Sequence, residues 1–190
     1  MDIVKAALLG LVQGFTEFLP ISSSGHLKLF GVEDLSLIVL FHFGTLLSIL
    51  VYYRRDVLAA ASGGWRLALA AGNAARGKRG LSEQLAGDAG ARTALIIIVG
   101  SIPTGIIGLG LKPLADYSVA PGHLKIVGAC FIVTGILMYF CDRFAASGKG
   151  LAQGTLRDAV TVGIFQGIAA MPGLSRSGLT VFSAVMRGFE

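Results

Sequence analysis

Apolar residues gather in three long runs along the chain, covering residues 35–53, 94–111 and 126–140. A transmembrane helix needs about 20 mainly apolar residues, so each run predicts a full or nearly full membrane crossing. Charged residues follow the first and third runs, whereas the second contains Pro103 and ends at Lys112-Pro113. Because proline removes a helical hydrogen bond, we expect Pro103 to break the second helix.

Two shorter apolar segments flank these runs and carry polar residues. Residues 2–19 have a helical pattern in which Gln13 and Glu17, four positions apart, share one face. Residues 159–171 form a segment of thirteen residues, which as a helix reaches about 20 Å, short of a hydrocarbon core of about 30 Å. The polar loop that follows is therefore expected at membrane depth, buried in protein or lining a wet cavity.

The two flanking segments resemble each other. QGFTEFLPISSSG (13–25) and QGIAAMPGLSRSG (166–178) both run from Gln-Gly through mostly apolar residues to Pro and S-x-S-G. Three crossings separate them, so the second is approached from the opposite side, as in an inverted-topology repeat whose broken helices meet near the midplane. We expect an all-α, polytopic membrane bundle of one domain, with a first repeat over 1–140 and the start of a second over 157–190.

Composition and charge agree with a membrane protein. The chain is 54% hydrophobic and 14% charged, against about 25% charged residues in soluble domains. Basic residues dominate positions 54–93, which predicts a cytoplasmic loop with a short surface helix near 65–71. That orientation places residues 112–125 outside and 142–158 inside.

Other sequence features exclude several classes of protein. The N-terminus lacks the features of a signal peptide, and no pattern indicates nucleic-acid binding. The two cysteines, eleven positions apart, are interpreted as buried apolar residues.

The polar residues of the two motifs suit a phosphate. Their serines offer hydroxyl groups, and Gly25 and Gly178 allow backbone N–H groups to approach a ligand closely. Helices that restart after each loop would direct their positive ends at the same place. Arg176 adds a guanidinium suited to bidentate phosphate contacts. Glu17 alone would repel phosphate, so we expect Mg²⁺ or Ca²⁺ between phosphate oxygens and Glu17.

Histidines provide the remaining candidates for chemistry. His26, close in sequence to Ser23 and Glu17, could act as general base or nucleophile. The plainer interpretation is a polar turn between helices, although ionisable groups inside a span are usually functional. His42, in the middle of the first run, is interpreted as a hydrogen-bonded packing residue. His123, in the expected outer loop, receives no role.

These motifs resemble those of the undecaprenyl-diphosphatases of bacteria, also called bacitracin-resistance proteins. QGFTEFLPISSSGHL (13–27) is similar to the family's [E/Q]-x-x-x-E region followed by P-x-S-S-[ST]-G-H. PGLSRSGLT (172–180) is similar to its P-G-x-S-R-S-G-x-T, and residues 42–56 resemble the crossing between them. The resemblance covers essentially the whole chain.

The resemblance implies a multi-pass hydrolase of the bacterial cytoplasmic membrane, with its site facing the outer side. Such an enzyme converts undecaprenyl diphosphate to undecaprenyl phosphate and inorganic phosphate, recycles the lipid carrier for peptidoglycan synthesis and confers bacitracin resistance. The implied partners are a polyprenyl diphosphate lipid and the bilayer, and a homodimer is left open. A divalent metal, Mg²⁺ or Ca²⁺, is implied as cofactor.

By motif position, the resemblance also implies roles for individual residues. The implied catalytic residues are Glu17, Ser23, His26 and Arg176, with the division between base and nucleophile left open. Gln13 and Glu17 are implied as metal ligands. The implied phosphate-binding residues are Gln13, Ser22, Ser24, Gly25, Ser175, Ser177, Gly178 and Thr180.

The sequence departs from the family pattern at two points. Gln13 stands where many members have Glu, and the chain stops at RGFE, where members continue through several further helices, so we expect a truncated chain.

A transporter or flippase for a phosphorylated polyprenyl lipid is the main alternative function, because inverted repeats with midplane loops typify transporters. A phosphatidic-acid type phosphatase ranks lower, because the histidine it needs after the second motif is absent.

Overall fold

The computed structural model describes residues 2–77, 85, 87–144, 148–150 and 153–189. This part of the chain is helical, apart from one isolated bridge between Lys149 and Phe189. Its helices are α1 (Ile3–Phe18), α2 (Ser23–Leu29), α3 (Leu35–Tyr52), α4 (Arg54–Ala75), α6 (Ala89–Ser118), α7 (Leu124–Cys141), α8 (Leu156–Ile168) and α9 (Arg176–Met186). The predicted all-α class is therefore confirmed.

Three of these helices are long and apolar enough to cross a membrane. They are α3, α6 and α7, with mean hydropathies of 2.1, 2.2 and 2.1. Large apolar side chains on them point outward, including Val39, Ile106 and Ile132. A lipid environment removes the penalty of exposing such side chains to water. The three predicted apolar helices are confirmed, and their length and hydropathy are those of a helical membrane protein.

The second crossing differs from its prediction. Helix α6 runs without a break through Pro103 and Pro113 to Ser118, so the break at Pro103 and the end at Pro113 were wrong. The helix continues because α8 packs closely against it around Pro103. The hydroxyl of Thr104 lies 2.9 Å from the carbonyl oxygen of Gly163 in α8. Such packing supports a proline-containing helix inside a membrane protein.

The expected basic loop is also largely helical. Helix α4 covers Arg54–Ala75, well beyond the predicted surface helix at 65–71, and packs against α6. Asp88 joins the two helices, because its carboxylate caps α6 at the Ala91 N–H and accepts a 2.6 Å hydrogen bond from Arg66 Nε. Both contacts lower the pKa of Asp88, and the hydrogen bond from the Ala91 N–H has the larger effect. Residues 78–84 and 86 of the predicted loop lie outside the described residues.

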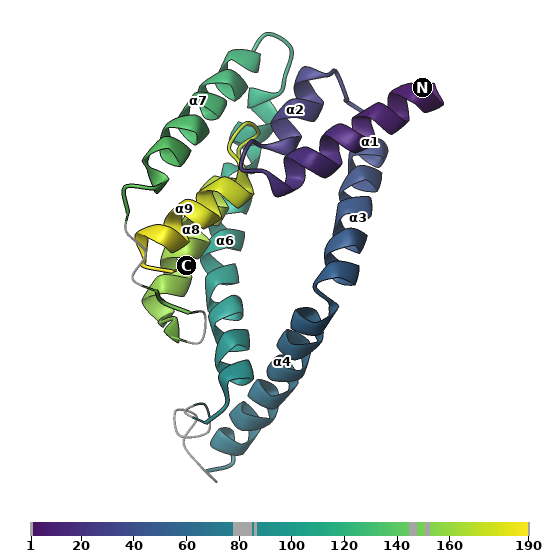
Figure 1. Ribbon diagram of the computed structural model, residues 1–190. Coiled ribbons are helices and arrows are strands. Elements are labelled where there is room, and N and C mark those ends of the chain that lie inside the picture. The colour runs from purple at the N-terminus through teal and green to yellow at the C-terminus, as the bar shows by residue number, and fades with distance from the viewer. Residues whose placement is uncertain (1, 78–84, 86, 145–147, 151–152, 190) are drawn as a thin grey trace.

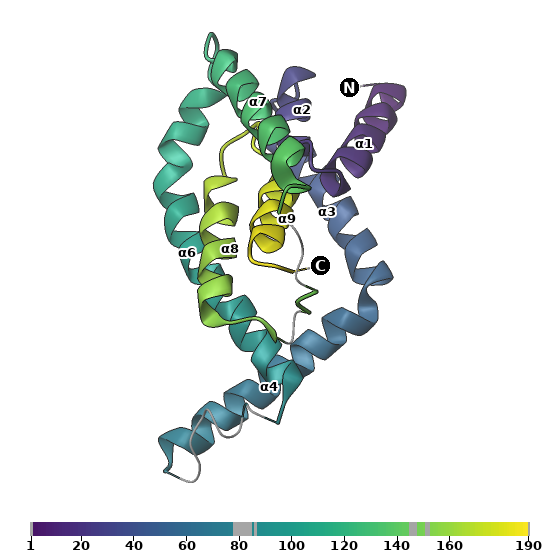
Figure 2. The ribbon, with the colours of Figure 1, turned by 60° about the vertical axis from the view of Figure 1, so that its left-hand side comes forward.

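The remaining helices bring the two motifs together. Helix α1 contacts α2 and α3, while α9 contacts α8 and α7 (Figures 1 and 2). The loop after α1 and the loop after α8 lie side by side, and the Ser177 hydroxyl donates to the carbonyl oxygen of Leu19 at 3.1 Å. The two short helices α1 and α8 thus end beside each other, and α2 and α9 begin there.

A buried carboxylate fixes the other ends of α8 and α9. Asp158 is 1% exposed and accepts hydrogen bonds from Lys149, from Arg187 Nε at 2.7 Å and from the backbone and hydroxyl of Thr155. Burial alone would raise the pKa of Asp158, but the hydrogen bonds from Lys149, Thr155 and Arg187 outweigh it and hold the pKa well below its usual range. The ionised Asp158 carboxylate therefore links the segment around Lys149, the start of α8 and the end of α9.

Substitution of Asp158 by asparagine should destabilise this end of the bundle. We expect a loss of roughly 3 kcal/mol, the lower end for breaking a buried pair because both cations are partly exposed. Thermal unfolding of the purified protein in detergent measures it, with Asp142→Asn at an exposed position as the control. Because folding lowers the pKa of Asp158, its stabilisation is complete above the unfolded value of about 3.9 and fades at lower pH. An Asp158→Asn protein as stable as the control at neutral pH would contradict this role.

Candidate active site

The two motifs line one polar cavity of about 110 Å³. Its walls are formed by Thr16, Glu17, Ser22, Ser23, Ser24, His42, Ala169, Leu174, Ser175, Arg176 and Ser177. Six of these residues carry hydroxyl groups, Glu17 carries a carboxylate and Arg176 carries a guanidinium group. Drug-sized ligands occupy pockets of about 300 Å³ or more. This cavity therefore suits a small polar group rather than a lipid chain.

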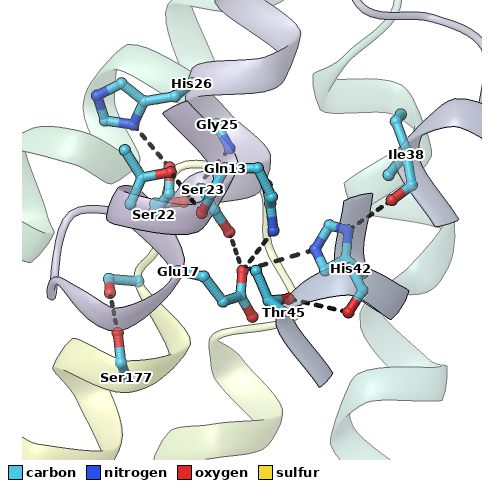
Figure 3. Close-up of polar contacts among 12 residues, drawn as sticks. Gln13, Glu17, Ser22, Ser23, Gly25, His26, Ile38, His42, Thr45 and Ser177 are labelled. Atoms are coloured by element: carbon cyan, nitrogen blue, oxygen red, sulfur yellow. Dashed lines mark hydrogen bonds and ion pairs between the residues drawn. The ribbon is translucent and has the colours of Figure 1, made fainter. Parts of the chain in front are cut away.

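Glu17 is the centre of the polar network (Figure 3). Its Oε2 atom accepts hydrogen bonds from Ser23 Oγ at 2.5 Å and from Gln13 Nε2 at 2.8 Å. His42 Nε2 lies 3.8 Å from the same oxygen. Side chains from α1, α2 and α3 thus meet at one carboxylate oxygen, and the Ser23 hydroxyl directs its proton toward it.

The first motif places Ser23 by means of a strained turn. Ser22 has φ 64°, the one non-glycine residue with positive φ among the described residues, and its hydroxyl accepts from the Gly25 N–H at 3.4 Å. Strain of this kind is concentrated at functional sites in proteins. The turn ends α1 and begins α2 at Ser23, so that Ser23 faces Glu17 across the loop.

The second motif is held from α7. Thr134 donates to the carbonyl oxygen of Gly173 at 3.2 Å and accepts from the Ser175 N–H at 3.1 Å. Gly173 has φ 93°, which favours glycine. The Ser175 hydroxyl caps α9 by accepting from the Gly178 N–H at 3.0 Å. This arrangement starts α9 at Arg176, beside the cavity.

Among the described residues that line the cavity, Arg176 alone carries a permanent positive charge. No described residue accepts a hydrogen bond from it or forms an ion pair with it, and its side chain is exposed. Its own N–H and that of Ser177 belong to the first turn of α9, where amides have no partner within the helix. A guanidinium and a helix N-terminus therefore both offer donors to an anion here.

A glycine in each motif permits close contact with the other motif. A Cβ at Gly25 would lie 2.6 Å from Phe131 Cζ and 3.0 Å from the Gly173 Cα. A Cβ at Gly178 would lie 3.2 Å from that of Pro20. A side chain at Gly25 would overlap Phe131, and one at Gly178 would make unusually tight contacts, so both glycines favour the close approach of the loops.

Replacing Gly25 by alanine should therefore separate the loops. We expect Gly25→Ala to lower stability by about 1–3 kcal/mol, the usual result of overpacking, and to weaken anion binding as well. Gly14→Ala is the matched control, because a Cβ there meets nothing within 4 Å and the residue lies in the same motif. Thermal unfolding of both variants tests the prediction, and equal stability would contradict it.

Several predicted site residues have other surroundings in the structure. The N–H groups of Gly25 and Gly178 bond to Ser22 and Ser175, so they cap α2 and α9 instead of facing a ligand. Thr180 lines a separate cavity of about 420 Å³ between α6, α8 and α9. These differences arise because helices α2 and α9 begin inside the S-x-S-G stretches and turn their third and later residues away.

His26 also lies outside the cavity walls. Its Nδ1 is 2.8 Å from the carbonyl oxygen of Ser22, and its ring packs edge-on against Phe131. Figure 3 shows the ring pointing away from Glu17. The structure therefore brings Glu17, Ser23 and Arg176 to one cavity and leaves His26 on the other side of the α2 turn.

Sequence reasoning missed two residues of the site, and the first is His42. It was interpreted as a packing residue, yet it lines the cavity and approaches Glu17. The available signal was its depth in an apolar run, where a polar ring needs a partner. The second is Thr134, which was missed because a single threonine in a membrane helix gives no indication of its contacts.

Two side-chain oxygens of the first motif suit a divalent cation. Gln13 is fully buried, and its Oε1 has no hydrogen-bond partner. All polar contacts of Glu17 described above involve Oε2, which leaves Oε1 available. The described residues contain no group of three or more His, Cys, Asp or Glu placed for a metal. The donor set fits Mg²⁺ or Ca²⁺ held by few protein oxygens together with phosphate oxygens of a substrate.

Comparison with known proteins places the chain in a family. Residues 6–190 match the family described as Bacitracin resistance protein BacA. An undecaprenyl-diphosphatase of Desulfatibacillum aliphaticivorans is 41% identical over all of this chain and 69% of its own length. Undecaprenyl-diphosphatases of Carboxydothermus hydrogenoformans and Alkaliphilus metalliredigens are 37% and 39% identical, over 65% and 68% of their lengths. The chain spans about two thirds of the length of these curated relatives, and it belongs to the bacitracin resistance protein BacA family.

Proposed function

We propose that the protein hydrolyses undecaprenyl diphosphate to undecaprenyl phosphate and inorganic phosphate. The relatives are named for this activity, and their identity extends over the whole of this chain. The single observation that carries the proposal is the cavity in which Ser23 and Glu17 of the first motif face Arg176 of the second. The proposed nucleophile, the proposed general base and a group that can bind phosphate thus line one cavity.

In the proposed reaction, Ser23 is the nucleophile and Glu17 its general base. The Ser23 hydroxyl already donates to Glu17 at 2.5 Å, within the reach required for proton transfer. As the Ser23 oxygen bonds to the terminal phosphorus, the bond from that phosphorus to the bridging oxygen breaks. Glu17 takes the hydroxyl proton and passes it to the departing undecaprenyl phosphate, which returns Glu17 to its carboxylate form. Water then attacks the phosphorus of the phosphoserine, and the bond between Ser23 Oγ and phosphorus breaks to release inorganic phosphate. Glu17 takes a proton from that water and returns it to Ser23 Oγ.

Arg176 and the first turn of α9 are proposed to bind the transferred phosphoryl group. Charge spreads over its equatorial oxygens in the transition state, and fixed donors aimed there supply most of the catalytic effect. Ser175 and Ser177 support this turn through their mutual contact at 3.1 Å and the bond from Ser177 to Leu19. A divalent cation held by Gln13 and Glu17 would neutralise the charge of the diphosphate.

We further propose that the motifs belong to an inverted repeat and that the site opens toward the outer face of the bacterial cytoplasmic membrane. Helices α1 with α2, and α8 with α9, have the same order of short helix, polar loop and helix. The orientation rests on the basic residues around α4, which favour the cytoplasmic side. Bacitracin resistance would follow from recycling of the lipid carrier.

Phosphate release separates the enzyme from the transporter alternative. The protein, expressed from its complete coding sequence and purified in detergent, should release phosphate from undecaprenyl diphosphate. A transporter would move the labelled lipid across proteoliposomes with its diphosphate intact. Absence of phosphate release, with or without added Mg²⁺ or Ca²⁺, would overturn the proposed activity.

A further inference from the structure

One hydroxyl group of α7 bridges two backbone groups of the second motif. Thr134 Oγ1 donates to the carbonyl oxygen of Gly173 at 3.2 Å and accepts from the Ser175 N–H at 3.1 Å. Both ends of this bridge are buried, since Thr134 is 3% and Ser175 1% exposed. A buried backbone group that loses its partner is costly, so the loop is held in the geometry that satisfies this hydroxyl.

The loop of the second motif lies directly against α7. A Cβ at Gly173 would lie 2.4 Å from the carbonyl oxygen of Val127 and 2.8 Å from the Cβ of Cys130. Val127, Cys130 and Thr134 follow one another at helical spacing, so they share one face of α7. The second motif therefore rests on this face, and Thr134 fixes its position there.

The same face of α7 also reaches the first motif. Phe131 packs edge-on against the His26 ring, with 5.0 Å between the ring centroids, and lies 2.6 Å from where a Cβ at Gly25 would be. None of the described residues that line the cavity comes from α7. This helix thus contacts both motifs from outside the cavity.

The influence of Thr134 on the cavity passes through Ser175. Ser175 is the N-cap of α9, and its hydroxyl accepts from the Gly178 N–H at 3.0 Å. Arg176, the next residue, lines the cavity together with Ser175 and Ser177. A shift of the Ser175 backbone would therefore move both the guanidinium and the first N–H groups of α9 relative to a bound anion.

We propose that Thr134 is a positioning residue that fixes the first turn of α9, so that Arg176 and the N–H groups of this turn meet the transferred phosphoryl group. The proposal rests on the proposed diphosphatase activity, because it assumes that this turn binds phosphate. Its consequence is kinetic, since displaced donors stabilise the transition state less. A displacement of about 1 Å can slow a reaction by roughly a hundredfold.

Substitutions at Thr134 isolate the effect of the hydroxyl. Thr134→Val replaces it by a methyl group of similar size, whereas Thr134→Ser keeps it. We expect kcat/KM for phosphate release from undecaprenyl diphosphate to fall about tenfold to a hundredfold in the Val variant and to stay within about threefold of wild type in the Ser variant. Thr134→Ala differs from Thr134→Ser only in the hydroxyl, so this pair gives the same comparison should the Val variant not fold.

Thr104→Val is the matched control. The Thr104 hydroxyl also contacts a glycine carbonyl of a neighbouring helix, at 2.9 Å from Gly163 in α8, but Thr104 does not line the cavity. Its loss should lower the unfolding temperature, as the loss of the Thr134 hydroxyl does, while kcat/KM stays within about twofold of wild type. Thermal unfolding in detergent and phosphate release, both measured on the protein expressed from its complete coding sequence, separate stability from positioning.

A double-mutant cycle with Arg176→Ala adds a second readout. Because Thr134 is proposed to act through the turn that carries Arg176, Thr134→Val should slow the Arg176→Ala enzyme by less than it slows wild type. The proposal would be overturned by equal kcat/KM in the Thr134→Val and Thr104→Val variants, by a Ser variant as slow as the Val or Ala variant, or by losses that multiply in full with Arg176→Ala. A wild-type protein that releases no phosphate would instead reject the underlying activity.

Discussion

Substitution of Ser23 by alanine should lower kcat for phosphate release by about a thousandfold or more. Ser23 is the hydroxyl that donates to Glu17, and its loss removes the nucleophile itself. Glu17→Gln should have a similarly large effect, because the amide keeps the shape of the side chain but cannot accept the proton. Both variants should remain folded, since the loops also make the Ser177–Leu19 and Thr134 contacts.

The control for Ser23 is Ser48→Ala, which removes a serine hydroxyl bonded to its own helix on the exposed face of α3. It should retain wild-type turnover. Kinetics of phosphate release, with thermal unfolding of each variant, provide the comparison. Turnover near wild type in Ser23→Ala would reject Ser23 as the nucleophile.

Substitution of Arg176 by alanine should lower kcat/KM by about a thousandfold. Its guanidinium lines the cavity without an acceptor among the described residues, so its charge is available to a phosphate. Arg176→Lys should recover only part of the loss, because lysine cannot make the bidentate contact. Arg143→Ala, which removes an exposed arginine beside Phe140, is the matched control. An Arg176→Ala enzyme with the kcat/KM of the control would contradict this assignment.

Much of the fold could be predicted from the sequence because lipid imposes simple rules. Apolar runs of bilayer length predicted α3, α6 and α7, and their structure agrees. The boundaries of α6 could not be predicted, since the effect of Pro103 depends on how closely α8 packs against it. Helix α4 was underestimated because its sequence, rich in Gly, Ala and Arg, resembles a loop, while its contacts with α6 stabilise it as a helix.

The candidate site was predictable in its residue types but not in its geometry. The repeated S-x-S-G stretches indicated a shared cavity, and the structure brings Glu17, Ser23 and Arg176 to one. Side-chain direction depends on where α2 begins, and this determines that Ser23 faces Glu17 while His26 faces Phe131. Whether His26 takes part in the reaction, as the resemblance implies, stays a prediction.

The central claim is that the two motifs form one catalytic site, and a double-mutant cycle tests it most directly. Phosphate release from undecaprenyl diphosphate is measured for wild type, Ser23→Ala, Arg176→Ala and the double variant. Residues that act as a unit in one reaction show strongly non-additive losses. We predict that the double variant is about as slow as the slower single variant. Losses that multiply in full would contradict a shared site.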